Sequence, residues 1–289
     1  MKPVAFEYCR PETAPEAAAL LAEFGVEASL LAGGMSLWPM LNMRLVRPRA
    51  VIDLTRVGGL GGIEVGSETV LTGSLVGQAE AMASDELMRE VPLLAMALPH
   101  VGHVQTRNRG TLGGSVAHGD PSAEIPLALV TLDGTVQLRS RSGERRVRAR
   151  EFFHGALETE RREDELITGL EWPRRVADAT YAFDEIAERH GDFAIAAAAC
   201  RLRIDTDGRL VELSLGLGGV EDHPFAIPLD GFVGEVAMPE FARRVAEAAA
   251  ELVRPIEDHV ASADYRRDLT RLLVGRVLDR AILEAKERR

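Results

Sequence analysis

Two glycine-rich stretches carry residues suited to holding a phosphorylated ligand. The first reads Ala32-Gly33-Gly34-Met35-Ser36 and lies between an apolar run that predicts a strand and a segment that predicts a helix. Backbone N–H groups at such a turn point outward as an anion-binding nest, and glycines let a phosphate approach the backbone closely. The stretch has neither the Gly-Lys-Ser/Thr ending of a P-loop nor the Gly-x-Gly-x-x-Gly spacing of a dinucleotide motif. ATPases and simple Rossmann dehydrogenases are therefore disfavoured, while a glycine pair that serves only the turn stays open.

The second stretch, residues 107–121, alternates small, hydroxylated and acidic side chains with almost no bulk. A second nest here would oppose the first, so that the two loops clasp the two phosphates of a long dinucleotide. Thr111 and Ser115 would donate hydroxyl groups, and Asp120 would accept from ribose or ribityl hydroxyls. We expect that a β-branched side chain at Gly33 or Gly113 excludes the ligand and leaves the fold intact, because it would fill the phosphate space.

Three other groups of polar residues allow more than one interpretation. His100 and His103 have the i, i+3 spacing of metal ligands, but no third ligand is nearby in the sequence, which disfavours a metal. His118 suits either a general base or, more simply, a hydrogen-bonding wall of the ligand pocket. Arg266 and Arg267 suit either a solvated helix face or a subunit contact.

The elements that must position these residues can be predicted from capping residues and periodicity. Thr13 and Glu16 predict a capped helix start, and Gly25 predicts its end. Strand, helix, strand, loop, helix and strand follow one another over residues 1–57, which indicates a compact α/β unit. Glycines among β-forming residues then predict hairpins over 63–72 and 136–147.

Further along the chain, the predicted elements change from helices to a hairpin and a long helix. Ser84 caps a predicted helix that Pro92 should break. The sequence Asp-Thr-Asp-Gly at 205–208 joins two apolar runs within 194–217 and predicts a hairpin. Ser262 predicts the cap of a C-terminal helix whose apolar residues recur at helical spacing.

The composition limits the classes of function. The 289 residues include 45 acidic and 34 basic side chains, so the formal charge is −11. This charge disfavours nucleic acid and anionic membranes as partners. The longest apolar run, 193–200, is far shorter than the ~20 residues that cross a bilayer, so we expect no membrane span.

The cysteines and the N-terminal segment indicate the compartment. Charges interrupt the apolar residues at the N-terminus, so no signal-peptide core forms there. Cys9 and Cys200 are too few for a disulfide scaffold or for a cluster held by four thiolates. We therefore expect a cytoplasmic protein, and electron transfer by this chain would need an organic cofactor.

Several stretches together resemble one family, the FAD-binding medium subunits of molybdenum hydroxylases. This family includes the carbon monoxide dehydrogenase flavoprotein and the matching domain of xanthine dehydrogenase. The order and spacing of the stretches agree with the family over essentially the whole chain. They lie at residues 32–37, 44–45, 51–54, 105–115, 117–121, 189–194 and 262–267.

The resemblance implies an α+β protein with an FAD-binding fold of the p-cresol methylhydroxylase and vanillyl-alcohol oxidase type, followed by a C-terminal domain of sheet and helices. The FAD-binding domain would cover residues 1–175, with an α/β subdomain over 1–57 and an antiparallel β subdomain with helices over 58–175. The C-terminal domain of the molybdenum hydroxylase flavoprotein type would cover 176–289. FAD would lie extended between the first two subdomains.

The same resemblance implies which residues contact FAD. Residues 32–36 would wrap the pyrophosphate on one side and residues 111–115 on the other. Asp120 would contact the flavin half, Ile167 would lie against FAD, and Phe193 would shield one face of the isoalloxazine ring. The implied set is Ala32, Gly33, Gly34, Met35, Ser36, Leu37, Thr106, Gly110, Thr111, Leu112, Gly113, Gly114, Ser115, Ala117, Asp120, Ile167 and Phe193.

Met35 and Phe193 differ from the other members of this set. Relatives commonly carry a polar residue where this chain has Met35, so only its backbone is expected to contact FAD. Phe193 precedes an apolar run, and without the family pattern it would equally suit the first position of a buried strand.

For function, the resemblance implies an oxidoreductase subunit that binds FAD and passes electrons from the [2Fe-2S] clusters of a small iron–sulfur subunit to an external acceptor. Substrate oxidation would occur at a molybdenum cofactor in a large partner subunit, and the assembly would be a dimer of heterotrimers. This chain would supply no catalytic residue and no metal ligand. Two alternatives stay open: an independent FAD-dependent oxidoreductase with His118 or Glu124 as its base, and a non-catalytic anion-binding module.

Overall fold

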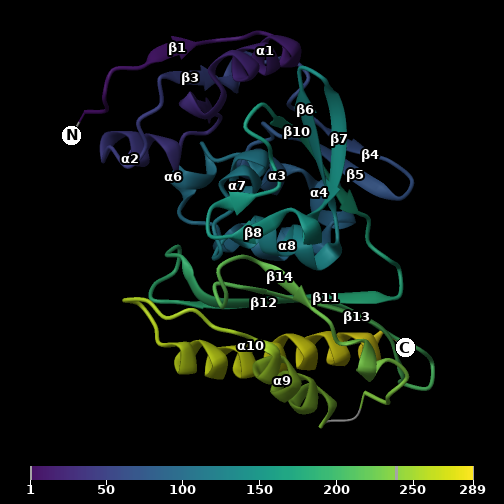
Figure 1. Cartoon of the computed structure of the whole chain (residues 1–289). Helices are drawn as coiled ribbons and strands as arrows, with labels where there is room; N and C mark the ends of the chain where they lie inside the picture. The colour runs from purple at the N-terminus through teal and green to yellow at the C-terminus, as the bar shows by residue number, and fades with distance from the viewer. Residues whose placement is uncertain (1, 238–239, 289) are drawn as a thin grey trace.

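The computed structural model describes residues 2–237 and 240–288, which form three parts stacked one on the next (Figure 1). The elements of the N-terminal part are β1 (Glu7–Cys9), α1 (Ala14–Phe24), β2 (Ala28–Leu31), α2 (Leu37–Asn42) and β3 (Ala50–Asp53). The three strands form a parallel sheet in the order β1-β3-β2. This is the order of strands and helices that the sequence predicts, and its central strand β3 is buried along its whole length.

Helix α1 begins and ends where its capping residues predict. The Glu16 N–H donates to Thr13 Oγ1 at 3.3 Å, and the Gly25 N–H donates to the Leu21 carbonyl at the other end. Gly25 has φ +53°, a conformation that glycine adopts without strain. The buried face of the helix, with Leu21 at its centre, packs against β3 and fixes the helix over the sheet.

The middle part is a five-stranded antiparallel sheet in the order β4-β5-β10-β6-β7, with a small two-stranded sheet beside it. Its strands are β4 (Ile63–Val65), β5 (Thr69–Gly73), β6 (Thr135–Ser140), β7 (Gly143–Arg148), β8 (Phe153–Gly155), β9 (Glu158–Thr159) and β10 (Leu166–Pro173). Both predicted hairpins are confirmed, as β4-β5 and β6-β7. Fully buried Trp172 on β10 links two neighbouring strands, because its indole N–H donates to Thr72 Oγ1 on β5 at 3.0 Å.

Helices fill the connection between β5 and β6. They are α3 (Gln78–Ala83), α4 (Asp85–Glu90), α5 (Pro92–Ala97), the short 3₁₀ helix η3 (Leu98–His100), α6 (Val104–Arg107), α7 (Leu112–His118) and α8 (Glu124–Leu132). Pro92 ends one helix and starts the next, as predicted, since its ring cannot follow a residue in helical conformation. Every residue of α8 is buried, so this helix is the centre of the molecule.

The C-terminal part is a four-stranded antiparallel sheet between two helical layers. Its elements are β11 (Ala179–Ala187), β12 (Ala194–Ile204), β13 (Leu210–Gly218), β14 (Phe225–Ile227), α9 (Phe241–Leu252) and α10 (Ala263–Glu287). Helix α8 covers one face of the sheet, and α9 and α10 cover the other (Figure 1). The predicted β12-β13 hairpin is confirmed, and Ser262 Oγ caps α10 by accepting from the Tyr265 N–H at 3.2 Å. No helix in the described ranges is long and apolar enough to cross a membrane.

The expected solvated face at the start of α10 is wrong for Arg266. Its side chain is 3% exposed, and its guanidinium donates to the carbonyls of Ile195 and Gly219 and to Asp258 Oδ2 at 2.7 Å. These carbonyls lie at the ends of β12 and β13, where the strand ladder no longer supplies a donor. Arg266 therefore holds the strand ends together from inside the C-terminal part.

Candidate functional site

A cleft of about 850 Å³ opens between the N-terminal part and the helices of the middle part, and it reaches residues of the C-terminal part. All of the sequence-predicted FAD residues line it except Leu112. Leu112 is the first residue of α7, and its fully buried side chain packs in the main core, so it anchors the loop from inside the protein. The fold thus brings the two glycine stretches and Phe193 into one cavity from three parts of the chain.

The loop between β2 and α2 turns a row of backbone N–H groups toward the cleft. Its carbonyls are used by the helix that follows, because the N–H of Trp38 donates to Gly34 and that of Met40 to Ser36. The N–H groups of residues 33–36 have no acceptor in the part of the chain that the structure describes. Residues 33–36 line the cleft, so these donors are available to an anionic ligand.

The second loop differs from the expected nest. Thr111 caps α7, with its Oγ1 accepting from the Gly114 N–H at 3.0 Å. The Leu112 N–H donates to the Val76 carbonyl at 2.9 Å, and the Gly113 N–H donates to the Ser74 carbonyl at 3.0 Å. The expectation of free amides is therefore wrong for residues 112–114. The loop offers the cleft the hydroxyl groups of Thr111 and Ser115 instead.

The glycines of both loops are required by contact between protein segments. A Cβ atom on Gly33 would lie 2.1 Å from the Arg109 carbonyl oxygen, and one on Gly113 would lie 2.5 Å from Ser74 Cβ. A side chain at either position would push protein segments apart. The expectation that such a substitution leaves the fold intact is therefore wrong, because the Cβ would point into the protein and not into the cleft.

Two polar side chains that the sequence does not single out complete this end of the cleft. Ser74 follows β5 and Gln78 begins α3, and they are 4% and 5% exposed. Ser74 Oγ and Gln78 Oε1 have no hydrogen-bond partner among the described residues. A buried polar atom without a partner costs about 1–3 kcal/mol, so a polar ligand that reaches these atoms would be stabilised. Both residues follow recurring glycines, but no pattern in the sequence marks them as polar lining.

Arg161 is a third cleft residue that no pattern in the sequence marks. Its guanidinium donates to the carbonyls of Arg162 and Glu165, at 2.9 and 2.8 Å, and forms no ion pair within the described residues. Burial lowers the pKa of this group, because water has restricted access to its charge. A cation in that position favours a ligand that carries negative charge.

The cleft lining also includes acidic residues and an aromatic ring. Phe193 is 73% exposed and stands directly before the buried strand β12, so the alternative that it begins the strand core is wrong. Asp120 Oδ1 accepts from the Ser122 N–H at 2.8 Å, which fixes the turn before α8. His118, at the end of α7, lies on the cleft wall, where either of its two interpretations would place it.

Glu124 is the most perturbed carboxyl group of the cleft. It is 7% exposed, and burial raises its pKa to about 7. His100, considered above as a metal ligand, pairs with a carboxylate. Its Nδ1 lies 3.0 Å from Glu185 Oε1, and this hydrogen bond raises the pKa of His100. In the described ranges no three His, Cys, Asp or Glu side chains are grouped to hold a metal ion.

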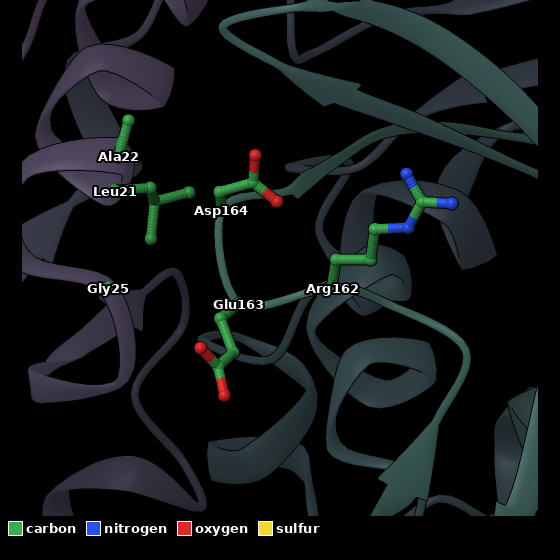
Figure 2. A pocket seen from close by; sticks show the side chains of 6 residues that line it. All are labelled: Leu21, Ala22, Gly25, Arg162, Glu163 and Asp164. Atoms are coloured by element: carbon green, nitrogen blue, oxygen red, sulfur yellow. The ribbon is translucent and has the colours of Figure 1, made fainter.

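A second, more open hollow of about 420 Å³ lies between the end of α1 and the loop at 162–164 (Figure 2). Leu21, Ala22 and Gly25 form one side, and the charged residues 162–164 form the other. It contains none of the residues predicted to bind FAD. The large cleft is therefore the candidate site.

Two family models cover the chain in succession. The model described as FAD binding domain in molybdopterin dehydrogenase matches residues 4–175, and the model described as CO dehydrogenase flavoprotein C-terminal domain matches residues 181–281. The chain belongs to the FAD-binding medium subunits of molybdopterin hydroxylases. The resemblance noted in the sequence is thereby confirmed, as is the α+β fold with an FAD-binding domain and a C-terminal domain.

Individual members of this medium-subunit family match over nearly their whole length. The nicotine 6-hydroxylase medium subunit of Paenarthrobacter nicotinovorans is 36% identical over 96% of this chain and 98% of its own. The structures of carbon monoxide dehydrogenase from Hydrogenophaga pseudoflava and quinoline 2-oxidoreductase from Pseudomonas putida 86 match with TM-scores of 0.94 and 0.93. Their sequence identities are 31% and 35%, and each match covers 99% of both chains.

As a member of this medium-subunit family, the chain is the flavoprotein subunit of a molybdenum-containing oxidoreductase. The free N–H row at residues 33–36 and the unpartnered atoms of Ser74 and Gln78 fit a ligand with phosphates and polar groups, as FAD has. The finer division of the chain at residues 57 and 175 stays a prediction.

Proposed function

We propose that this chain binds FAD in the large cleft and passes electrons from iron–sulfur clusters of a partner subunit to an external acceptor. The observation that carries the proposal is the row of N–H groups at residues 33–36, which face the cleft without an acceptor among the described residues. The pyrophosphate of FAD is the part of the cofactor that such donors recognise. Thr111 and Ser115 would donate hydroxyl groups to it from the opposite loop.

The rest of the proposed site follows the length of the cleft. Ser74 and Gln78 would offer their unpartnered oxygens to polar groups of the cofactor, and Arg161 would compensate its negative charge. Ile167 lines the cleft as a buried apolar contact, and Phe193 would cover one face of the ring. We propose that the other residues of the predicted FAD set contact the cofactor directly. Leu112 acts indirectly, by supporting the loop.

When bound, the flavin can receive electrons one at a time from one-electron carriers and pass them in pairs to a two-electron acceptor. The chain itself would bind the cofactor, orient it and limit the access of water. Phe193 is placed to exclude water from the ring, since its side chain stands free of the core at the cleft wall. Asp120 would accept a hydrogen bond from the cofactor through the oxygen that does not hold the Ser122 N–H.

We propose partners of the kind that the resemblance implies: a large molybdenum-binding subunit and a small subunit with [2Fe-2S] clusters, in a dimer of heterotrimers. A cluster of this type needs four ligands, commonly thiolates, and this chain has two cysteines, Cys9 and Cys200. Family membership supports the proposal, because medium chains of this kind belong to complexes of several subunits. Both cysteines are free, which is consistent with a reducing cytoplasm.

A second candidate function is an independent FAD-dependent oxidoreductase. It is favoured by one specific observation, which is that Glu124 lines the cleft with a pKa of about 7 and so suits a general base at neutral pH. In the leading proposal the same carboxyl group is no general base, because substrate is oxidised in the partner subunit.

The two candidates separate in one experiment. The chain is purified alone and, through a tag on this chain, with the subunits that accompany it. The leading proposal predicts that the isolated chain carries FAD and oxidises no substrate, and that its flavin absorbance bleaches anaerobically when the reduced iron–sulfur subunit is added. Substrate oxidation by the isolated chain would favour the second candidate, and a colourless chain that does not take up added FAD would contradict both.

A further inference from the structure

Glu124 is a buried acid at the cleft wall without a cationic partner. It is the first residue of α8, and its carboxyl group forms no ion pair within the described residues. Glu124 has no role in the proposed FAD binding or electron transfer. A buried carboxyl group without such a partner is stable only if it is protonated for much of the time.

A pair of titratable groups, one buried and one partly exposed, lies near Glu124. His100 of η3 and Glu185 of β11 are joined by a 3.0 Å contact between Nδ1 and Oε1. The Glu185 side chain is 6% exposed, and its Oε2 has no partner in the described ranges. The His100 side chain is one third exposed and packs against the Phe183 ring, with centroids 5.0 Å apart. The pair thus extends from the interior to solvent.

Burial has the largest effect on the pKa of Glu124 and raises it, while a hydrogen bond from the residue's own N–H lowers it. Of the neighbouring charges, Glu185 on β11 and Asp120 in the preceding turn raise this pKa, and His100 on η3 lowers it. Asp184, which also acts on His100, is held by two arginines of α10 and so is compensated. Because Glu124 lines the cleft, charge that appears there also acts on it.

We propose that Glu124 takes up a proton when electrons reach the flavin end of the cleft and releases it when they leave, and that His100 and Glu185 exchange this proton with solvent. The inference rests on the proposed function, which supplies the electrons from reduced iron–sulfur clusters. In this proposal the proton on Glu124 compensates the negative charge of the added electrons. The His100–Glu185 pair connects Glu124 to solvent water.

The reduced iron–sulfur clusters lose two electrons and FAD in the cleft would gain them. His100 takes a proton from solvent and passes one to the Glu124 carboxylate through a bridging water. No hydrogen bond joins Glu124 to the pair directly among the described residues. Helix α8, which begins with Glu124, packs against η3, which carries His100, so we infer that water connects the two groups. When the electron pair passes to the acceptor, the Glu124 proton leaves by the same route.

The test measures the midpoint potential of the bound flavin against pH in the full chain loaded with FAD. Above the pKa of Glu124, at about 7, the wild type should take up one more proton per electron pair than Glu124→Gln. The control, Glu86→Gln on the exposed face of α4, should match the wild type. An unchanged pH dependence in Glu124→Gln would overturn the inference.

A second measurement does not depend on the variant folding. In the wild type, about one pH unit above that pKa, the reduced-minus-oxidised infrared spectrum should gain a protonated carboxyl band. A wild-type spectrum without this band overturns the inference even when FAD is fully bound, and the proposed function then stands. A wild-type chain that binds no FAD overturns the proposed function instead, and the inference with it.

Discussion

A Cβ atom on Gly33 would lie 2.1 Å from the carbonyl oxygen of Arg109. The loop after β2 and the turn before α7 therefore pack backbone against backbone, although they are distant in the sequence. This contact joins the N-terminal part to the helices of the middle part and fixes the spacing of the two loops on either side of the cleft.

The first prediction concerns this contact. Gly33→Ala should lower the free energy of unfolding by about 1–3 kcal/mol, because overpacked segments must move apart, and it should reduce FAD content. Gly61→Ala is the matched control, since a Cβ there meets nothing within 4 Å. Chemical denaturation measures both variants. A Gly33→Ala protein as stable as the control would mean that the loops are not in close contact.

Ser74 allows a test of the cleft that leaves the fold alone. Its Oγ has no partner in the described structure, so Ser74→Ala should leave the free energy of unfolding of the FAD-free protein unchanged or raise it. FAD affinity should fall about five- to tenfold, the loss of one hydrogen bond worth roughly 1 kcal/mol. Titration of the apoprotein with FAD measures this, with the exposed turn residue Ser67→Ala as control. Equal affinities in the two variants would remove Ser74 from the site.

Phe193→Ala should separate cofactor binding from ring protection. The side chain is 73% exposed, so its loss should change the free energy of unfolding by no more than about 0.5 kcal/mol. FAD should stay bound through the phosphate contacts, and the reduced flavin should be reoxidised faster by dissolved oxygen. Tyr265→Ala, an exposed aromatic residue on α10, is the control. If stopped-flow reoxidation rates agree among all three proteins, Phe193 does not cover the ring.

Glu124 predicts a pH dependence of stability. Its pKa rises from the ordinary value of 4.5 to about 7 on folding, so the folded state favours the protonated form. The resulting stability is complete below about pH 4.5 and is lost as the pH rises to about 7, by roughly 3 kcal/mol. Glu124→Gln cannot titrate and should lack this loss, while the control Glu86→Gln keeps it. Parallel unfolding curves for the wild type and Glu124→Gln at every pH would refute the assignment.

Local signals were sufficient to predict much of the fold. Thr13 and Gly25 mark the ends of α1, and the turn glycines mark three hairpins, because capping and turn formation depend on neighbouring residues. The free N–H groups of the 32–36 loop could be predicted for the same reason. Its free N–H groups follow from a strand-to-helix turn.

Contacts between distant segments could not be predicted from local patterns. The Leu112 and Gly113 N–H groups bind carbonyls of residues 76 and 74, which no local rule pairs with them. Arg266 looks like a solvated helix residue until the ends of β12 and β13 supply carbonyls to it. Ser74 is similar, because a serine after a strand becomes cleft lining only when α7 packs beside it.

A crystal structure of the full chain loaded with FAD would show where the cofactor binds. We expect the pyrophosphate oxygens within hydrogen-bond distance of the N–H groups of residues 33–36, with Ser115 on the opposite side and Phe193 against the isoalloxazine ring. Phosphates bound elsewhere, or a cleft that stays empty at saturating FAD, would contradict the proposed FAD site.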